Sequence, residues 1–430
     1  MRWRLMAPLG VAMVCAMLVA WGGVGPLRVL AATAPVVFRA SAEAGNPKLA
    51  KKKEYLRSRF VDVDFKLLKD KTVDRVTLNL FPDASLVAVR ETLERDRDGT
   101  WEWSGSIDGV EDSEVLFEVD EDSMAGEIRV GKRTFAIEDT TGPHLVVELD
   151  PRFVLKDGKN DDPPVTERQH KAPTATHEDD GSVIDVMVVY TLDAKEEAGG
   201  QRGMETRIDR AVAVSNRSFK NSRIPTSFRL VHAQEVDYSE DDYDTQETLH
   251  RLRDPEDGYM DEVHGWRDQY AADVVVLLVA SEEPCPGMAA LMGPNRRNKE
   301  MERYAFAVVA IDYASEYLTF PHEIGHIMGC CHDKDNAGSG GGAYPYSFGW
   351  PTEEFRDIMS YSQPSGCRRV SYWSNPRVEY QGVPTGIEDE ADNARSITNV
   401  LKIVANFRDS TTATAQTSHQ WEVVARRLAR

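Results

Sequence analysis

Three histidines and a glutamate in the stretch HEIGHIMGCCH have the types and the spacing of a metal site. His322 and His326 are four residues apart, so on a helix their imidazoles lie on one face, one turn apart. Gly329 accepts the positive φ that often ends a helix, and the chain can then bring His332 to the same ion. Three neutral imidazoles leave a fourth position for water, which is typical of a catalytic zinc. Glu323 lies beside the first ligand, where its carboxylate can accept a hydrogen bond from that water.

A surface helix that happens to carry histidines is the competing interpretation of this stretch. Histidine occupies 10 and glycine 30 of the 430 positions. Chance would therefore add both Gly329 and His332 to a given HExxH about once in 600 cases. The spacing favours one catalytic zinc ion.

The segment DIMSY, residues 357–361, strengthens the metal-site interpretation because it places Met359 downstream of the third histidine. HEIGHIMGCCH followed by IMSY resembles the metzincins, whose HExxHxxGxxH motif is followed by a methionine turn beneath the metal. Asp333 after the third histidine resembles the reprolysin, or adamalysin, branch. GCRRVSYWSNPRVEYQGVPTG and ADNARSITNV resemble bacterial members of that branch, including the peptidyl-Asp metalloendopeptidases. The resemblance covers residues 183–408, and LNLFPDASLVAVRETLE and TWEWSGSIDG resemble the region that precedes such catalytic domains.

The resemblance implies a zinc metalloendopeptidase and assigns roles to the residues at matching positions. His322, His326 and His332 would bind one zinc ion, which would lower the pKa of water towards about 7 and polarise the substrate carbonyl. Glu323 would act as general base and then as general acid towards the leaving amine. Met359 would form the hydrophobic floor under the ligands, a place that an ordinary core methionine would also fill.

Residues that contact substrate are expected in three places. Tyr361 matches a tyrosine that astacin- and serralysin-like metzincins place near zinc, where it would stabilise an oxyanion or act as a zinc switch; adamalysins do not rely on it, and the alternative is a packed, hydrogen-bonded tyrosine. Arg368 and Arg369 could pair with an acidic side chain just after the cut, unless both face water. The stretch PCPGMAALMG resembles the edge strand that binds substrate backbone, or is an ordinary edge strand. Its candidate residues are Gly287, Met288, Ala289, Ala290 and Leu291.

The catalytic region is expected to be a metzincin-like α/β (α+β) domain with a mixed, mostly parallel sheet and an active-site helix. VIDVMVVYT, SFRLVHAQEVDY, ADVVVLLVA and YAFAVVAID read as strands, and METRIDRAVAVSNRSFKNS and TQETLHRLRD as helices. Such alternation favours parallel strands covered by helices. Residues 58–150 contain seven short strand-like segments separated by Gly and Asp turns. This pattern predicts a small β-rich domain, either a sandwich or a barrel-like fold.

Five regions follow from these patterns. They are a signal peptide (1–34), a β-rich N-terminal domain (35–156), a polar linker open to proteolysis (157–182), the catalytic domain (183–408) and a C-terminal tail (409–430). The N-terminal domain is expected to be a propeptide, so the protein would be made as a zymogen. No cysteine lies between residues 35 and 284, which excludes latency through a cysteine thiolate on zinc and leaves another ligand, occlusion or folding assistance.

The N-terminus predicts export. Arg2 and Arg4 precede a long uncharged run, and Ala32, Thr33 and Ala34 form a small-x-small cleavage site. The expected location is therefore extracellular, with a periplasmic or N-terminally anchored form as the alternative.

Four cysteines lie beyond the signal peptide, and in an exported chain an even number favours disulfides. Cys330 and Cys331 are adjacent, so each would pair with one of the distant two, Cys285 and Cys367. Buried thiols are the alternative.

Composition limits the class of partner. The formal charge of −20, from 71 acidic and 51 basic residues, argues against nucleic acid. We expect protein or peptide substrates and no stable membrane insertion after signal removal, and the oligomeric state is not predicted. The acidic runs SEDDYD and EDEADN could bind calcium, although a solvated acidic face is the stronger interpretation. Two alternatives to a peptidase are a secreted metal-binding adhesion or interaction protein without peptidase activity, and zinc hydrolysis of an ester or small amide.

Overall fold

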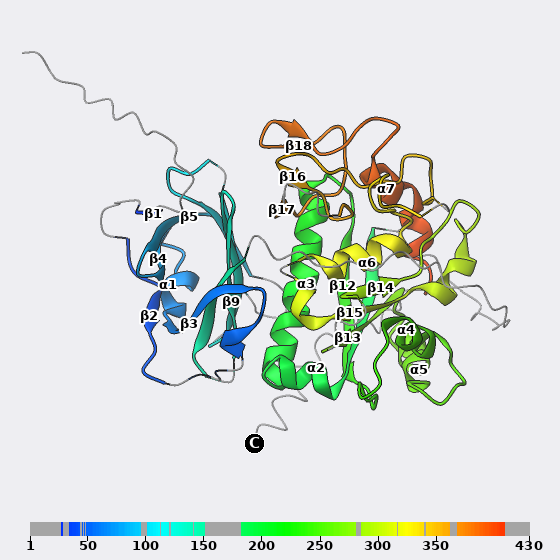
Figure 1. Ribbon diagram of the computed structural model, residues 1–430, viewed down its shortest axis with the longest axis horizontal. Coiled ribbons are helices and arrows are strands. Elements are labelled where there is room, and N and C mark those ends of the chain that lie inside the picture. Colours follow the sequence, from blue (N-terminus) through cyan, green and yellow to red (C-terminus); the bar gives the residue numbers. More distant parts are fainter. Residues whose placement is uncertain are drawn as a thin grey trace, which may run out of the picture.

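The computed structural model contains two domains that meet along helix α3 (Gln201–Asn221), which stands between them in Figure 1. No helix among the described residues is both long and apolar enough to span a membrane. The expected signal peptide (apart from residues 27–28 and 34), nearly all of the linker and the C-terminal tail beyond residue 408 lie outside the described residues. Those residues are 27–28, 34–43, 45, 47, 49–95, 101–111, 113–119, 122–140, 142–150, 182–280, 285–315, 317–338, 341–361 and 368–408.

The N-terminal domain is one large, mainly antiparallel sheet with the strand order β1-β5-β6-β7-β8-β9-β10-β3-β2, and β4 pairs with β5. A bridge between Val36 and Thr77 joins the chain before β2 to β4, so the two edges of the sheet meet. Trp103, Phe117 and Phe135 are fully buried inside it. The strands are β1 (Leu27–Arg28), β2 (Phe38–Ala40), β3 (Tyr55–Val63), β4 (Arg75–Phe81), β5 (Ala84–Arg95), β6 (Trp101–Ile107), β7 (Ser113–Val119), β8 (Met124–Val130), β9 (Arg133–Glu138) and β10 (His144–Leu149).

The seven strand-like segments of the sequence coincide with β4 to β10. Strands β2 and β3 were not predicted, because YLRSRFVDV in β3 carries three charged residues and its alternation is weak. The short helices η1 (Leu49–Lys51) and α1 (Phe65–Lys69) flank β3. Asp64 caps α1 by accepting a hydrogen bond from the backbone N–H of Leu67.

The second domain, which the sequence predicts to be the catalytic domain, has a five-stranded sheet with the order β12-β11-β13-β15-β14. Four strands are parallel, and the edge strand β14 runs antiparallel to β15. The chain thus combines helices with both parallel and antiparallel strands, and antiparallel pairing dominates the N-terminal sheet. The strands are β11 (Val183–Tyr190), β12 (Ser227–Glu235), β13 (Val274–Val279), β14 (Gly287–Ala289) and β15 (Phe306–Ala310).

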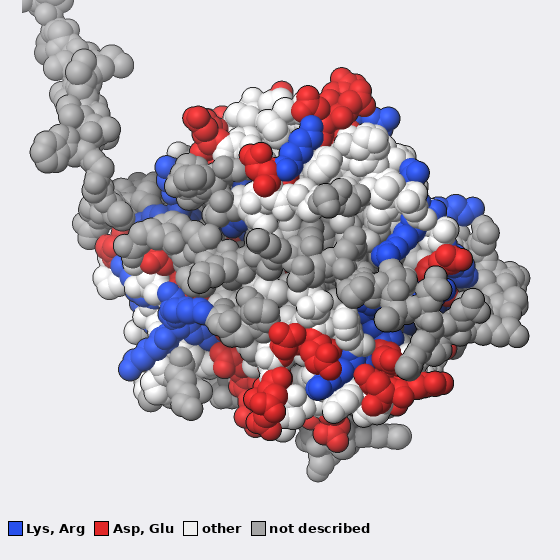
Figure 2. Space-filling model, turned by 45° about the vertical axis from the view of Figure 1, so that its right-hand side comes forward, with Lys and Arg blue, Asp and Glu red and all other residues white. Residues whose placement is uncertain are grey.

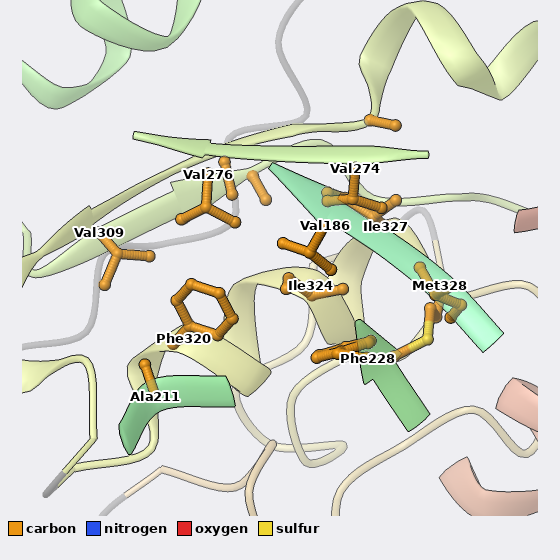
Figure 3. Close-up of a cluster of buried hydrophobic side chains, with 14 of the residues drawn as sticks. Val186, Ala211, Phe228, Val274, Val276, Val309, Phe320, Ile324, Ile327 and Met328 are labelled. Carbon is orange, nitrogen blue, oxygen red and sulfur yellow. The ribbon is translucent and has the colours of Figure 1, made fainter. Parts of the chain in front are cut away.

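Helices cover both faces of this sheet. Alternate residues of β11 point to opposite sides, so Val186 packs with α3 and α6 while Met187 packs with α4 and α5. Figure 3 shows the first side, where Phe320 and Ile324 of α6 meet Val186 of β11 and neighbouring strand residues. The helices are α2 (Leu192–Glu197), α3, α4 (Thr245–Arg253), α5 (Glu262–Gln269), η2 (Lys299–Tyr304), η3 (Ile311–Tyr313), α6 (Thr319–Ile327) and α7 (Asn393–Val404).

The two acidic runs contribute helix caps. Asp244 accepts a hydrogen bond from the Glu247 backbone at the start of α4, and Asp392 does the same for Arg395 at the start of α7. Figure 2 shows acidic and basic side chains interspersed on one face, with acidic groups gathered along its upper and lower margins.

The cysteines differ from the expected disulfide framework. Cys285, Cys330 and Cys331 are buried thiols, and no disulfide joins any two of them. The Cys285 thiol instead donates a hydrogen bond to the Gly287 carbonyl oxygen at 3.1 Å. Cys367 lies outside the described residues.

Candidate metal centre

Helix α6 (Thr319–Ile327) carries two of the three histidines and ends where Gly329 begins the next turn. Gly329 has φ 79°, and its N–H donates to the carbonyl oxygen of His326 at 2.9 Å. A Cβ at this position would lie 2.4 Å from the Cβ of Ala343. Glycine is therefore required both by the backbone dihedral and by the neighbouring chain, and the turn leads His332 back to the helix.

The three histidines form one buried cluster. Their ligand atoms lie within 4.8 Å of one another, and the Nε2 atoms of His322 and His332 are 3.1 Å apart. The ring of His326 lies 4.9 Å from that of His322 and 4.8 Å from that of His332, centroid to centroid. None of the three residues is more than 3% exposed.

Backbone carbonyl oxygens orient two of these rings. Nδ1 of His322 lies 2.8 Å from the Ile358 oxygen, and Nδ1 of His326 lies 2.8 Å from the Cys330 oxygen. A carbonyl oxygen can only accept, so each Nδ1 carries the proton and donates it. The lone pair of each ring is then on Nε2, the tautomer that a metal ion needs.

The cluster is held in the neutral state by its surroundings. Burial lowers the pKa of His322 and His332 well below the usual value, and the nearby Arg369 guanidinium lowers it further. Burial lowers the pKa of His326 to about 4. Neutral imidazoles are the form that binds zinc, so this donor set fits a zinc ion. Within the described part of the chain, these three residues are the group of ligand-type side chains close enough to share one ion.

Met359 lies fully buried against the active-site helix. A Cβ on Gly325 would lie 2.8 Å from the Met359 sulfur and 2.7 Å from the ring of Trp373. Gly325 therefore lets the methionine and the indole approach the helix backbone between the two histidines. The sequence did not single out Gly325, although a glycine inside a helical pattern often marks close packing.

Glu323 lies next to the edge strand. It is 5% exposed, and a Cβ on Gly287 of β14 would lie 2.5 Å from its Oε1 atom. Only the first three of the five candidate edge residues form the strand; Ala290 and Leu291 follow it as buried, non-strand chain. The Met292 N–H just beyond donates to the His326 carbonyl oxygen at 2.9 Å, which ties this segment to the end of α6.

Tyr361 lies beside the third histidine, with its ring 4.2 Å from that of His332. Its backbone N–H donates to Asp333 Oδ2 at 3.0 Å, and Asp333 also accepts from the Asn336 amide. Asp333 is 2% exposed, so this carboxylate joins the turn after His332 to the turn after Met359.

Arg369 is buried beside the histidines. It is 7% exposed and donates to the Tyr317 carbonyl oxygen at 2.9 Å and to that of Ser360 at 3.4 Å. It therefore does not face water, in contrast to the alternative considered from sequence. The backbone of Arg368 is part of β17 (Arg368–Arg369), and the side chain of Arg368 lies outside the described part of the chain.

Asp357 is a further buried group at the methionine turn that the sequence did not single out. Burial raises its pKa to about 7, while a hydrogen bond from the Ser360 hydroxyl lowers it. Its second oxygen accepts from the Ser374 N–H at 2.9 Å. In the sequence, the only sign of this group was an acidic residue directly before the apolar pair Ile358 and Met359. The burial of Asp357 could not be predicted from it, because that burial depends on tertiary contacts.

Comparison with known proteins agrees with this geometry. A family model described as metallo-peptidase family M12 matches residues 180–374. The chain is 32% identical to a peptidyl-Asp metalloendopeptidase of Stenotrophomonas maltophilia over 353 residues, which is 75% of this chain and 80% of that protein. The chain belongs to metallopeptidase family M12, a family of zinc enzymes, and is a metalloendopeptidase.

A second curated relative and one solved structure also match the chain. A peptidyl-Asp metalloendopeptidase of Xanthomonas campestris pv. campestris is 33% identical over 298 residues, which is 67% of this chain and 68% of that protein. The crystal structure of metalloproteinase-II from Bacteroides fragilis is 13% identical, with a TM-score of 0.41, and the match covers 76% of this chain and 90% of that one. At that TM-score the structural likeness adds nothing to the family assignment.

Proposed function

We propose that His322, His326 and His332 hold the catalytic zinc of this endopeptidase and that Glu323 is its general base. The observation that carries the proposal is the convergence of three neutral, buried imidazoles, two of them oriented by backbone carbonyls. Glu323 lies between His322 and His326 in the sequence of the same helix, next to the edge strand where a peptide would bind.

The chemistry is peptide-bond hydrolysis. A zinc ion bound by the histidines would supply a Lewis acid that acidifies water and polarises the scissile carbonyl. Glu323 takes the proton from the attacking water and delivers it to the leaving amine. The ring of Tyr361, next to His332, is suited to bring its hydroxyl to the developing oxyanion. Met359 acts through packing, as the floor beneath the ligands.

The substrate lies extended along β14. This strand is at the edge of the sheet, so its outer side can add one more antiparallel strand. Gly287, Met288 and Ala289 supply the backbone groups, and Ala290 and Leu291 continue the wall. Calcium plays no part in this proposal.

Arg369, with Arg368 beside it, selects an acidic side chain just after the cut. Arg369 is buried close enough to lower the pKa of all three histidines, so its charge lies near the reacting bond. The relatives named peptidyl-Asp metalloendopeptidases are consistent with such a preference. A peptide library that showed only large apolar residues after the cut would overturn this assignment.

The remaining proposals concern the organisation of the precursor. Residues 1–34 export the chain, residues 35–156 form a prodomain, the linker 157–182 is open to proteolysis, and residues 183–408 are the secreted peptidase, with 409–430 as a tail. Each domain has an apolar core of its own, although Leu116 of β7 joins the core of the catalytic domain, and these two cores support this division.

Glu323→Gln is the experiment that tests the function. The variant keeps the shape of the side chain but cannot take up a proton, so kcat falls by roughly 100- to 10,000-fold. Bound zinc, measured by atomic emission, stays at the wild-type level because the three histidines are unchanged. Glu247→Gln on the exposed part of α4 is the matched control and keeps full activity. A Glu323→Gln protein with most of its activity would show that another group is the base.

A further inference from the structure

Helix α3 lies beside the N-terminal sheet (Figure 1). Four arginines of this helix form ion pairs with carboxylates of the N-terminal domain. The carboxylates that meet them come from β7, β8, the end of β9 and the turn before β8. Each arginine has its own position along the helix, so the pairs define one register between the two domains. The pairs are Arg202 with Asp122 at 2.7 Å and Asp139 at 3.2 Å, Arg207 with Glu138 at 3.2 Å, Arg210 with Glu127 at 3.8 Å, and Arg217 with Glu114 at 3.1 Å.

A lysine of the N-terminal domain adds two ion pairs to the contact, next to Arg207. Lys52 forms ion pairs with Asp312 and, at 2.9 Å, with Glu197, both in the catalytic domain. Arg207 also reaches Asp312, at 2.9 Å. The Lys52 side chain is 9% exposed and that of Glu138 is 7% exposed. These charges are compensated by partners from the other domain, so separating the domains would break an ion pair of each of them.

Apolar and hydroxyl side chains also take part in this contact. Leu116 of β7 belongs to the apolar core of the catalytic domain, where Val214 of α3 is also buried. The hydroxyls of Ser123 and Thr206 are 3.3 Å apart. Paired charges make an interface specific, and such an interface weakens when salt screens the charges.

The contact does not use the metal centre. The hydrogen-bond partners of the His322, His326 and His332 rings are one another and backbone oxygens of the catalytic domain. The ion pairs of the N-terminal domain described above end on α2, α3 and Asp312. In the described residues, the two domains are therefore joined through a face of α3 and not through the metal ligands.

We propose that the N-terminal domain is a non-covalent partner of the catalytic domain, and that its acidic sheet face stays docked on the arginines of α3 after the linker is cut. A break within residues 157–182 then yields a two-chain complex, and release of the N-terminal domain is a separate step that needs its charges to be screened. This inference concerns binding between the domains and does not depend on the proposed catalytic roles.

The contact also supports the chain that leads into the active-site helix. Asp312, held by Lys52 and Arg207, lies in η3 (Ile311–Tyr313), just before α6. Further along this segment, the Tyr317 carbonyl oxygen accepts the hydrogen bond from Arg369. Loss of the N-terminal domain therefore removes a support from residues 311–318, and amide exchange in that segment should increase.

The experiment uses the full-length chain with a specific protease site placed within residues 157–182 and with Glu323→Gln to prevent self-digestion. After complete cutting at about 1 µM protein and about 0.1 M salt, both fragments should elute together in size-exclusion chromatography. Raising the salt to about 1 M should separate them, because ion pairs hold the contact. Amide exchange should rise in α3 and residues 311–318 only after separation. Fragments that separate at low salt would overturn the proposal, and so would a complex indifferent to salt.

A charge reversal tests the register of the pairs. Arg217→Glu should weaken the cut complex at least about tenfold, because it places two carboxylates opposite each other. Adding Glu114→Arg should restore part of the affinity. Arg395→Glu is the matched control, since that arginine pairs with Asp389 on the exposed side of α7. If the two fragments bind each other equally well in Arg217→Glu and in wild type, the assigned register is wrong. The salt titration uses the wild-type interface, so its result does not depend on whether these variants fold.

Discussion

The histidine cluster and the cluster at the domain junction are both buried groups of titratable side chains, and they are built in opposite ways. The histidine cluster consists of three neutral rings of one chemical kind, two of them oriented by backbone carbonyl oxygens. The domain-junction cluster combines two cations with two anions from both domains. Its members are Lys52, Glu138, Arg207 and Asp312.

The contrast separates a ligand site from a structural contact. In the junction cluster every charge has an opposite charge within ion-pair distance, so the cluster is complete in itself. The histidine cluster brings together donor atoms of a single type, and under the proposed function a cation from outside the chain would complement them. Removing a residue from the first cluster should therefore affect stability, and removing one from the second should affect activity.

Loss of one imidazole is the largest expected effect. His326→Ala should reduce bound zinc and lower kcat/KM at least about 1000-fold, because two histidines hold the ion poorly. When a chelator has removed the metal from both proteins, the free energy of unfolding of His326→Ala should differ from that of wild type by only about 1–2 kcal/mol. The difference comes mainly from the lost hydrogen bond to the Cys330 carbonyl oxygen. Metal analysis, peptide hydrolysis and urea unfolding measure these quantities, with His250→Ala as the control. Stoichiometric zinc in His326→Ala would contradict the ligand assignment.

Loss of one junction charge should show the reverse pattern. Arg207→Met leaves Asp312 and Glu138 short of a buried cation, so the free energy of unfolding should fall by about 3–5 kcal/mol. The kcat/KM of the folded fraction should stay within about twofold of wild type, because no metal ligand is touched. Urea unfolding and peptide hydrolysis test both statements. The exposed control Arg395→Met should change neither, and a stable but inactive Arg207→Met protein would break the comparison.

A smaller effect on activity is expected from the edge strand. Gly287→Ala would place a Cβ 2.5 Å from the present position of Glu323 Oε1, so the carboxylate must move. A misplaced base should lower kcat by about 10- to 100-fold while zinc content stays unchanged. Gly265→Ala in α5 is the control, because a Cβ there meets no atom within 4 Å. Wild-type kcat in Gly287→Ala would show that the position of Glu323 is not set by this strand.

The smallest effect concerns the pH dependence of the junction. Burial, together with the like-charged neighbours Asp312 and Glu138, raises the pKa of Glu54 to about 7. A carboxyl with a raised folded-state pKa binds its proton more tightly in the folded chain than in the unfolded chain. Its contribution to stability is therefore fully present below about pH 4.5 and is lost as pH rises to about 7.

Glu54→Gln should flatten this dependence. The difference in melting temperature between the variant and wild type should change steadily between about pH 4.5 and 7 and then level off. Thermal unfolding followed by circular dichroism measures it. A difference that did not vary with pH would show that Glu54 does not titrate in this window.

Local periodicity predicted most of the elements, and long-range pairing explains what was missed. The strand-like segments of both domains and helices α3 and α4 appear at the expected residues, because each buries one face and alternates accordingly. Strand β3, with its charged residues, is a strand because β10 pairs with it. Helices α5 and α7 were not predicted, and the cysteine pairing expected from compartment and number is absent among Cys285, Cys330 and Cys331.

The grouping of the three histidines of the candidate metal centre was readable from the sequence alone, because four-residue spacing on a helix and a glycine turn are local properties. His322, His326, Gly329 and His332 needed no information from elsewhere in the chain. The environment of that centre was decided by tertiary structure: the burial of Arg369, the carboxylates of Asp333 and Asp357 and the approach of Gly287 to Glu323 all join segments far apart in sequence. The docking of the N-terminal sheet on α3 has the same origin. Which arginine meets which carboxylate depends on how two complete domains pack, and no local pattern encodes that choice.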